Sequence, residues 1–394
     1  MAGKSGDNGF LARDCRSGRI AEYSHKSGAL IKDSDLPGNN RSDSDVPFIG
    51  DGLVDLQING VNGIDFNTCS LSEEGLISAA GYLLTRGITT FFPTVITNST
   101  KNTRSILSVI DRACLANPLL NQCIGGIHLE GPFISRSDGY RGAHRKRYVR
   151  APDWELFSSF QEASGGRIRI ISLSPEWDNS IDFIEKCKKR GLLVGIAHSA
   201  AGAEQVISAV RAGARLASHL GNGVPLMLPR HSNTIYEQLA NEHLHASIVA
   251  DGFHLPDPFI RVVIKTKRKK ALLVSDATCF TGMPPGVYKA HIGGDVVLGG
   301  DGSLRIKGGK GLLAGSAKLL TDNVQYMADN DLANLSMAWY MASTGPSRLV
   351  NLKRTAGYDN ERDRVLFNFK TGKIIIYEVW KNGVSVWKSH RSAN

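Results

Sequence analysis

Short apolar segments that each end in one ionisable residue are the feature that most constrains the fold of this chain. The five clearest are Gly126-Ile127-His128-Leu129-Glu130-Gly131-Pro132, Gly195-Ile196-Ala197-His198-Ser199, Ser218-His219-Leu220-Gly221-Asn222, Ala250-Asp251-Gly252-Phe253-His254 and Leu273-Val274-Ser275-Asp276-Ala277. Short apolar runs bounded by turn-forming residues are typical of buried strands. We therefore expect the ionisable side chains at the C-termini of strands, where the active site of a (β/α)8 barrel lies.

Eight apolar runs alternate with segments of helical periodicity. The runs are Leu53–Ile58, Thr89–Val95, Ile124–Leu129, Ile168–Leu173, Leu192–Ala197, Leu216–Ser218, Ala246–Val249 and Leu272–Val274. Eight strands with helices between them favour a closed (β/α)8 TIM-type barrel over an open doubly wound sheet. Because the chain has 394 residues and such a barrel needs only about 250, a second, smaller unit is expected.

Strand-like segments near both ends of the chain supply the second unit. They lie at Arg19–Tyr23, Ala29–Ile31, Arg364–Phe369, Lys373–Trp380 and Gly383–Trp387. We predict that residues 1–47 and 351–394 form a small β-sandwich domain beside a barrel of residues 48–350. Residues 33–46 are polar and rich in Gly, Ser and Asp, so we expect part of the N-terminal segment to be flexible.

A net charge of +10 indicates an anionic partner, and two basic runs, 141–150 and 265–270, carry much of it. Neither run has the aromatic stacking residues or the motif of a nucleic-acid-binding protein, so we expect no nucleic acid. The second run suits a solvated helix face, and the first suits a loop that meets an anionic substrate. A phosphorylated small molecule fits this charge.

Cysteine usage and hydropathy predict a cytoplasmic protein. Six cysteines are scattered without a CxxC pair, which is typical of reduced thiols and not of a disulfide framework. No apolar run approaches the roughly 20 residues that span a bilayer, and residues 1–7 lack the apolar core of a signal peptide. We therefore expect no membrane association.

The ionisable residues after the predicted strands have the composition of a metal site. Glu130, His198 and His219 offer one oxygen and two nitrogens, and the two histidines are one strand-helix unit apart. Three protein ligands with an open position are the set of a catalytic metal site. The set suits Zn²⁺, Fe²⁺, Co²⁺ or Mn²⁺, with Zn²⁺ the ion we expect. A histidine after a strand is also commonly a core residue without a ligand role.

Asp276 follows the eighth predicted strand and is not one of the three expected metal ligands, so it is available for proton transfer. A carboxylate beside a cation can accept a proton from activated water and pass it to the leaving group. Its alternative role is a helix N-cap, for which Asp is favoured.

Together these segments resemble the N-acetylglucosamine-6-phosphate deacetylases of the amidohydrolase superfamily. The likeness spans about residues 50–350 and includes Val54–Gly60 at the first strand and Leu313–Ala317 late in the chain. It implies a metal-dependent hydrolase that cleaves the acetamide of N-acetylglucosamine 6-phosphate to glucosamine 6-phosphate and acetate. Where many amidohydrolases have an HxH pair for a second metal, this chain has Gln57 and Asn59. We therefore expect one metal ion per subunit.

Further roles are implied by position in this family. His254 would polarise the substrate carbonyl, with a plain loop histidine as the alternative. His144, Asn222, the Gly223 backbone, Arg230 and His254 would bind the substrate, mainly at its phosphate. Arg230 would reach across the interface of a homodimer, although an ordinary surface arginine is the alternative. Asp251 suits a structural turn, since Asp-Gly pairs mark turns.

Departures from the family pattern occur in the substrate loops. Gly221–Val224 replaces the usual residues after the second metal-binding histidine, and Arg145–Arg147 is a basic run where a proline is expected. These changes keep open the same chemistry on a different N-acetylhexosamine phosphate or another N-acyl substrate. A barrel that has lost turnover and serves as a scaffold is a further alternative, which the intact set of site residues disfavours.

Overall fold

The computed structural model describes residues 9–33, 46–291, 294–309, 312–352, 362–370 and 372–390. The segment predicted to be flexible, 33–46, lies outside the described residues except at its two ends. Within the described part, no helix is both long enough and apolar enough to span a membrane.

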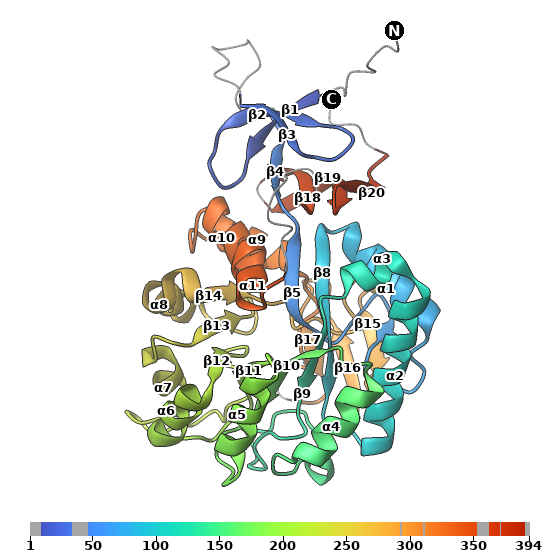
Figure 1. The fold of residues 1–394 in the computed structure, drawn as a ribbon. Helices are drawn as coiled ribbons and strands as arrows, with labels where there is room; N and C mark the ends of the chain where they lie inside the picture. The colour runs from blue at the N-terminus through green and yellow to red at the C-terminus, as the bar shows by residue number, and fades with distance from the viewer. Residues whose placement is uncertain are drawn as a thin grey trace.

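The central element is a sheet of eight parallel strands (Figure 1). Its strands, in spatial order, are β5 (Leu53–Ile58), β8 (Ile88–Ile96), β9 (Ile127–Glu130), β10 (Ile168–Leu173), β11 (Leu193–Ile196), β12 (Ala214–Ala217), β13 (His245–Ile248) and β14 (Ala271–Leu273). The first and last strands meet just beyond their ends, where Asn59 N donates to the Ala277 carbonyl at 2.7 Å and Ile58 forms a bridge with Ala277. The predicted (β/α)8 barrel is confirmed.

Helices cover the outside of the barrel because each has one apolar face. In α2, for example, Ile106, Leu107 and Ile110 are buried against the sheet while the opposite face is polar. Serine side chains begin α1 and α2 by accepting hydrogen bonds from first-turn amides. The barrel helices are α1 (Glu73–Leu84), α2 (Thr100–Ala116), α3 (Pro118–Cys123), α4 (Trp154–Ala163), α5 (Ser180–Lys189), α6 (Ala203–Ala212), α7 (Thr234–Ala240) and α8 (Asp257–Lys267).

Strands from both ends of the chain form one seven-stranded sheet, as predicted for the second unit. It consists of β1 (Gly9–Asp14), β2 (Ile20–Ser24), β3 (Leu30–Asp33), β4 (Phe48–Asp51), β18 (Arg364–Lys370), β19 (Lys373–Lys381) and β20 (Val384–Lys388). The two halves join at β4, which pairs parallel with β1 and antiparallel with β18. The sheet lies at one end of the molecule, where β4 leads into β5 (Figure 1). The boundaries at residues 47 and 351 stay a prediction.

The remaining elements follow or interrupt the barrel. A three-stranded antiparallel sheet comes after β14, and three helices complete the barrel wall before the chain returns to the terminal sheet. These elements are β15 (Gly286–Lys289), β16 (Asp295–Leu298), β17 (Leu304–Ile306), α9 (Leu320–Asp329), α10 (Leu335–Ala342) and α11 (Thr344–Leu349), with a small hairpin, β6 (Gly60–Val61) and β7 (Ile64–Asp65), after β5. Both β5 and β14 therefore open into additional structure at the mouth of the barrel.

Candidate metal and catalytic site

All predicted site residues lie at or beyond the C-terminal ends of barrel strands. Glu130 is the last residue of β9, and the others lie in the loops after β9 (His144), β11 (His198), β12 (His219, Asn222, Gly223, Arg230), β13 (His254) and β14 (Asp276). In a barrel of parallel strands these ends share one face, where the loops form the active site. The topology therefore gathers residues that are up to 146 positions apart, from Glu130 to Asp276, at one mouth.

Three of these residues have a left-handed backbone. The φ angles of His198, His219 and Asp276 are 47°, 34° and 48°, a region that costs a non-glycine residue roughly 1–3 kcal/mol. Hydrogen bonds hold the backbone there: His219 N donates to Ser247 Oγ and Asp276 N donates to the Gln57 carbonyl, both at 2.9 Å. Such strain is concentrated at functional sites, where it aims a side chain that an extended strand would direct elsewhere.

A buried cluster of one carboxylate and several imidazoles is the centre of the mouth. His219 Nε2 lies 2.9 Å and His198 Nε2 lies 3.8 Å from Glu130 Oε1. His144 joins them, with its Nε2 4.0 Å from Glu130 Oε2. Ligand atoms of Glu130, His144 and His198 all lie within 4.8 Å of one another. The structure thus brings together the three residues expected to bind metal and adds a third imidazole.

The protonation of this cluster follows from its charges. Although burial alone would raise it, the hydrogen bond and charge of His219 hold the pKa of Glu130 well below its usual range. Burial opposes a charge on His219, but Glu130 outweighs it and raises the pKa of His219 to about 9. Burial lowers the pKa of His198 to about 3 and that of His144 to about 4. His198 and His144 are therefore neutral at neutral pH, as metal ligands must be.

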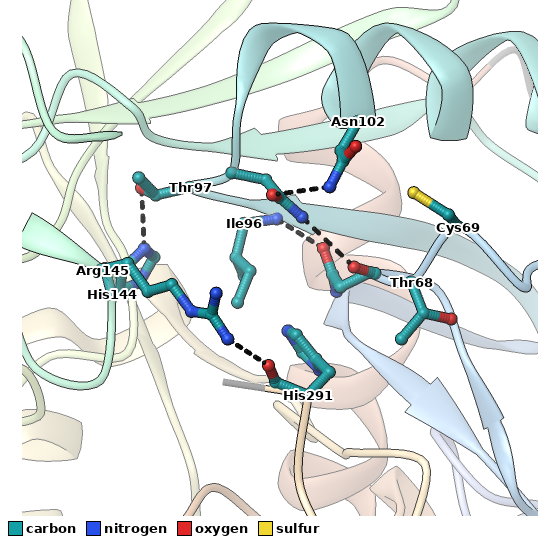
Figure 2. A pocket seen from close by; sticks show the side chains of 10 residues that line it. Thr68, Cys69, Ile96, Thr97, Asn102, His144, Arg145 and His291 are labelled. Carbon is teal, nitrogen blue, oxygen red and sulfur yellow. Dashed lines mark hydrogen bonds between the residues drawn. The ribbon is translucent and has the colours of Figure 1, made fainter. Parts of the chain in front are cut away.

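Neighbouring groups orient the imidazoles toward Glu130. His198 Nδ1 donates to the Tyr140 carbonyl at 3.0 Å, and His144 Nδ1 lies 2.9 Å from Thr97 Oγ1 (Figure 2). A histidine whose Nδ1 is held in this way presents Nε2 to a metal, the usual arrangement in metal sites. Oxygen and neutral nitrogen donors at these separations fit a divalent transition metal ion.

Asp276 is held by the two amides that replace an HxH pair. Asn59 Nδ2 donates to Asp276 Oδ1 at 2.7 Å, and Gln57 Nε2 donates to the same oxygen at 3.2 Å and to Glu130 Oε1 at 3.0 Å. Among the described residues, none donates a hydrogen bond to Asp276 Oδ2. Burial raises the pKa of Asp276 to about 6. One carboxylate oxygen is therefore fixed and the other remains for a proton.

His254 has a carboxylate partner that the sequence analysis assigned only to a turn. Asp251 Oδ2 lies 2.7 Å from His254 Nδ1, and its Oδ1 accepts from the backbone amides of Phe253 and His254 at 2.9 Å. Although burial alone would raise it, the hydrogen bond from His254 keeps the pKa of Asp251 below its usual range. Asp251 therefore fixes the ring of His254 and places a proton on Nδ1, leaving Nε2 free. The three-residue spacing in Asp-Gly-Phe-His could have indicated this pair.

The residues expected at the phosphate differ in how close they are to the cluster. Gly223 packs so tightly that a Cβ atom there would lie 2.5 Å from His198 Nδ1, and the buried Asn222 Nδ2 has no partner among the described residues. Arg230 is exposed and makes no hydrogen bond or ion pair with any described residue. It follows Leu226 and Met227, which are 96% and 88% exposed. Within one chain, Arg230 is thus not joined to the site.

Known proteins support the resemblance that the motifs indicated. The chain is 29% identical to the N-acetylglucosamine-6-phosphate deacetylase of Bos taurus over 321 residues, covering 79% of this chain and 76% of that protein. It is 28% identical to the same enzyme of Danio rerio over 364 residues, covering 89% and 87%, and 29% identical to that of Bacillus subtilis over 294 residues, covering 72% of each. No profile of a known protein family matches the chain.

Solved structures agree on the fold. The N-acetyl-D-glucosamine-6-phosphate deacetylase of Mycobacterium smegmatis, in complex with N-acetyl-D-glucosamine-6-phosphate, superposes with a TM-score of 0.81 at 22% identity, covering 96% of this chain and 99% of that one. The deacetylase of Thermotoga maritima superposes with a TM-score of 0.78 at 23% identity, covering 96% and 98%. The barrel and the terminal sheet together are thus an arrangement found in these proteins.

Proposed function

We propose that this chain, whose similarity to N-acetylglucosamine-6-phosphate deacetylases covers most of its length, hydrolyses the acetamide of N-acetylglucosamine 6-phosphate. The products are glucosamine 6-phosphate and acetate. The observation that carries the proposal is the buried cluster of Glu130, His198 and His219 with Asp276 beside it, bridged by Gln57. This arrangement combines metal donors with a separate proton carrier, as amide hydrolysis by activated water requires.

Glu130, His198 and His219 would hold one divalent ion, Zn²⁺ in the first place and Fe²⁺, Co²⁺ or Mn²⁺ otherwise. Such an ion supplies a Lewis acid and lowers the pKa of water toward neutrality. The amides of Gln57 and Asn59 already donate to Glu130 and Asp276, so they are oriented as hydrogen-bond donors and not as ligands. This supports a single ion per subunit.

Asp276 acts as the general base and then as the general acid. Its Oδ1 is held by Asn59 and Gln57, so Oδ2 accepts the proton of the attacking water and delivers it to the amine nitrogen as the C–N bond breaks. His254, oriented by Asp251 through its Nδ1 proton, carries a second proton on Nε2 and donates it in a hydrogen bond to the carbonyl oxygen as negative charge develops there.

Substrate binding is assigned to His144, Asn222, Gly223, Arg230 and His254. The unpartnered Asn222 Nδ2 is a donor available for a phosphate oxygen, and the missing side chain of Gly223 lets the backbone approach. Arg230 lies beside the exposed Leu226 and Met227. An apolar protrusion of this kind suits an interface, so we propose a homodimer in which Arg230 reaches the partner's phosphate site. The cytoplasmic location stays a prediction.

A second candidate keeps the chemistry and changes the substrate to another N-acetylhexosamine phosphate or a different N-acyl compound. The loop Gly221–Val224 favours it, because Gly223 packs on His198 and this loop departs from the family pattern. Comparing kcat/KM for the glucosamine, galactosamine and mannosamine derivatives, with and without phosphate, separates the two candidates.

The test is acetate release from N-acetylglucosamine 6-phosphate by metal-loaded protein, measured beside the Asp276→Asn variant. We expect turnover in the parent protein and a loss of about 10³-fold or more in the variant, because the amide cannot accept the proton. Equal metal content in both proteins is the control. Absence of turnover in a parent protein with one bound metal ion per chain would contradict the substrate, and full turnover in the variant would contradict the role of Asp276.

A further inference from the structure

A polar cavity of about 210 Å³ adjoins the metal and catalytic site. Its walls come from the loop after β7, the end of β8, the first turn of α2, the loop after β9 and the loop after β15, and they include Thr68, Asn102, Arg145 and His291 (Figure 2). We call it the Arg145 cavity. His144 is the only one of its lining residues to which a role in the proposed reaction has been given, so the proposed function leaves most of this space unexplained.

The Arg145 cavity lies across the mouth from the expected phosphate site. Most of its walls follow the first three strands of the barrel, with His291 added from the loop after β15, whereas Asn222 and His254 follow the sixth and seventh strands, β12 and β13. His144 stands between the cavity and the metal donors: its Nδ1 side meets Thr97, which lines the cavity, and its Nε2 lies 4.0 Å from Glu130 Oε2. A substrate with its phosphate beyond β12 and its amide at Glu130 has its other end directed at this cavity.

The charge of the Arg145 cavity suits an anion. Arg145 Nη2 donates to the His291 carbonyl at 2.7 Å, and Arg145 forms no ion pair with a described residue. Two carboxylates lie near the cavity, and both have partners: Asp138 bonds Arg141 at 2.8 Å and Lys146 at 3.6 Å, and Asp65 bonds His291 at 2.7 Å. None of the ten described residues that line the cavity is acidic. The guanidinium is therefore anchored at its position and free to grip an oxyanion bidentately.

We infer that the Arg145 cavity binds a second anionic group, a carboxylate or a phosphate, at the end of the substrate opposite the 6-phosphate. The inference rests on the proposed function and on Arg145, which stands in the basic run that replaces an expected proline. The volume is several times the roughly 30 Å³ share of one water molecule, so a group of several heavy atoms fits. The group is carried either on the N-acyl chain or on C1 of the sugar.

The reaction itself is unchanged by such a group. For an N-succinyl substrate, water adds its oxygen to the acyl carbon, the C–N bond breaks, and the amine nitrogen takes the proton. One water is consumed, and glucosamine 6-phosphate and succinate are released. For a C1 phosphate the acetyl group is still the one removed, and the phosphate stays on the sugar.

The test compares kcat/KM for three substrates: N-acetylglucosamine 6-phosphate, N-succinylglucosamine 6-phosphate and N-acetylglucosamine 1,6-bisphosphate. Arg145→Ala should lower the kcat/KM of a doubly anionic substrate relative to the N-acetyl monophosphate by tenfold or more. Arg147→Ala is the matched control, because Arg147 is an exposed arginine of the same run that packs on the Tyr148 ring, and it should leave the ratio unchanged. A loss confined to the succinyl substrate assigns the anion to the acyl chain, and one confined to the bisphosphate assigns it to C1. An unchanged ratio for both overturns the inference.

A second measurement keeps the inference testable if none of the three substrates is hydrolysed, which would contradict the proposed function instead. Cys69 is exposed and lines the Arg145 cavity, so its alkylation by iodoacetamide reports occupancy. We expect succinate or inorganic phosphate to slow the labelling of Cys69, followed by peptide mass spectrometry, in the parent protein and in Arg147→Ala but not in Arg145→Ala. Equal labelling of all three proteins with and without the anion overturns the inference.

Discussion

The mouth of the barrel has two parts that differ in how firmly the chain holds them. Glu130 is buried and Asp276 is half-buried, and each carboxylate is bonded to side chains from other parts of the barrel. The loop after β12 instead exposes Leu226 and Met227 almost completely, and the exposed Arg230 side chain makes no hydrogen bond or ion pair with a described residue. The first part is organised within one chain, whereas the second presents groups that only a further molecule can engage.

This difference indicates that the proposed reaction and the proposed binding of the substrate phosphate depend on different interactions. A preorganised site stabilises the transition state without reorganisation during the reaction, so changes there should lower kcat. Changes in the exposed loop should alter the binding of substrate and of a second copy, which raises KM. The following predictions test this division, beginning with the largest effect.

Glu130→Gln should abolish metal binding and lower kcat on the order of 10³-fold or more, because a neutral amide is a poor ligand and leaves the imidazoles without their anionic partner. Metal content by elemental analysis and acetate release measure the two effects. Glu176→Gln is the control, since Glu176 is another carboxylate after a neighbouring strand, bonded to Ser135 and Ser174, and it should retain metal and turnover. A Glu130→Gln protein that binds a full complement of metal and is active would contradict the central role of Glu130 in the organised part of the mouth.

Asp251→Asn should lower kcat by roughly 10²-fold with a small change in KM, because a neutral amide removes the negative charge beside a ring that must carry a proton on both nitrogens to donate from Nε2. Steady-state kinetics provide the measurement. Asp257→Asn removes a nearby carboxylate that bonds the Tyr326 hydroxyl at 2.8 Å and should leave kcat unchanged. If both variants behave alike, Asp251 is a turn residue only.

Arg230→Ala should raise KM for the phosphorylated sugar about tenfold and leave kcat nearly unchanged, as expected when one charged hydrogen bond of about 1.5–3 kcal/mol is lost. The unphosphorylated sugar should show no such change. A large fall in kcat would show that the exposed loop also takes part in the chemistry, and the division would fail.

Replacing Leu226 and Met227 together by serine should weaken self-association, because it removes the exposed apolar surface of the loop. Sedimentation velocity measures the oligomeric state, and Leu115→Ser, at a residue that is 73% exposed on α2, is the control for a general loss of surface apolarity. If Arg230 acts across the interface, KM should rise as the protein is diluted and the dimer dissociates. A double variant with unchanged association would rule out this loop as the interface.

Asn59→Ala should have the smallest effect, a shift in pH dependence. Asp276 must be ionised to accept a proton, so kcat/KM falls as the pH falls through its pKa. Burial raises that pKa to about 6, a bound cation lowers it, and the bond from Asn59 at 2.7 Å also lowers it because it stabilises the carboxylate. Removing Asn59 should therefore move the acid limb upward by about half a pH unit. An acid limb of kcat/KM that does not move would contradict the role of Asn59 in lowering the pKa of Asp276.

The fold could be predicted well where burial alone determines the sequence pattern. Strands enclosed on both faces are mainly apolar, as in β5 and β10, so the sequence pattern predicts all eight barrel strands. It does not predict strands β1 and β4, because both are partly exposed and lack a continuous apolar run. Pairing between β4 and β18 is a tertiary interaction that no local pattern indicates.

The site was predictable residue by residue but not as a network. Glu130, His198, His219 and Asp276 follow apolar runs and could be found from that position. The bonds of Gln57 and Asn59 to Asp276 could not, because they join residues more than 200 positions apart. Asp251 was interpreted as a turn residue, and its Oδ1 does bond the turn amides, but only the structure shows that its second oxygen holds His254.

The pairing of strands in the terminal sheet affects how the protein folds during its synthesis on the ribosome. Strand β4 ends at Asp51, and the strand that covers its free edge, β18, begins at Arg364. Translation therefore delivers one half of this sheet long before the other, and an uncovered strand edge is a template for pairing with other chains. The edge of β4 therefore stays open while the entire barrel is synthesised, and a strand made after the barrel then covers a strand made before it.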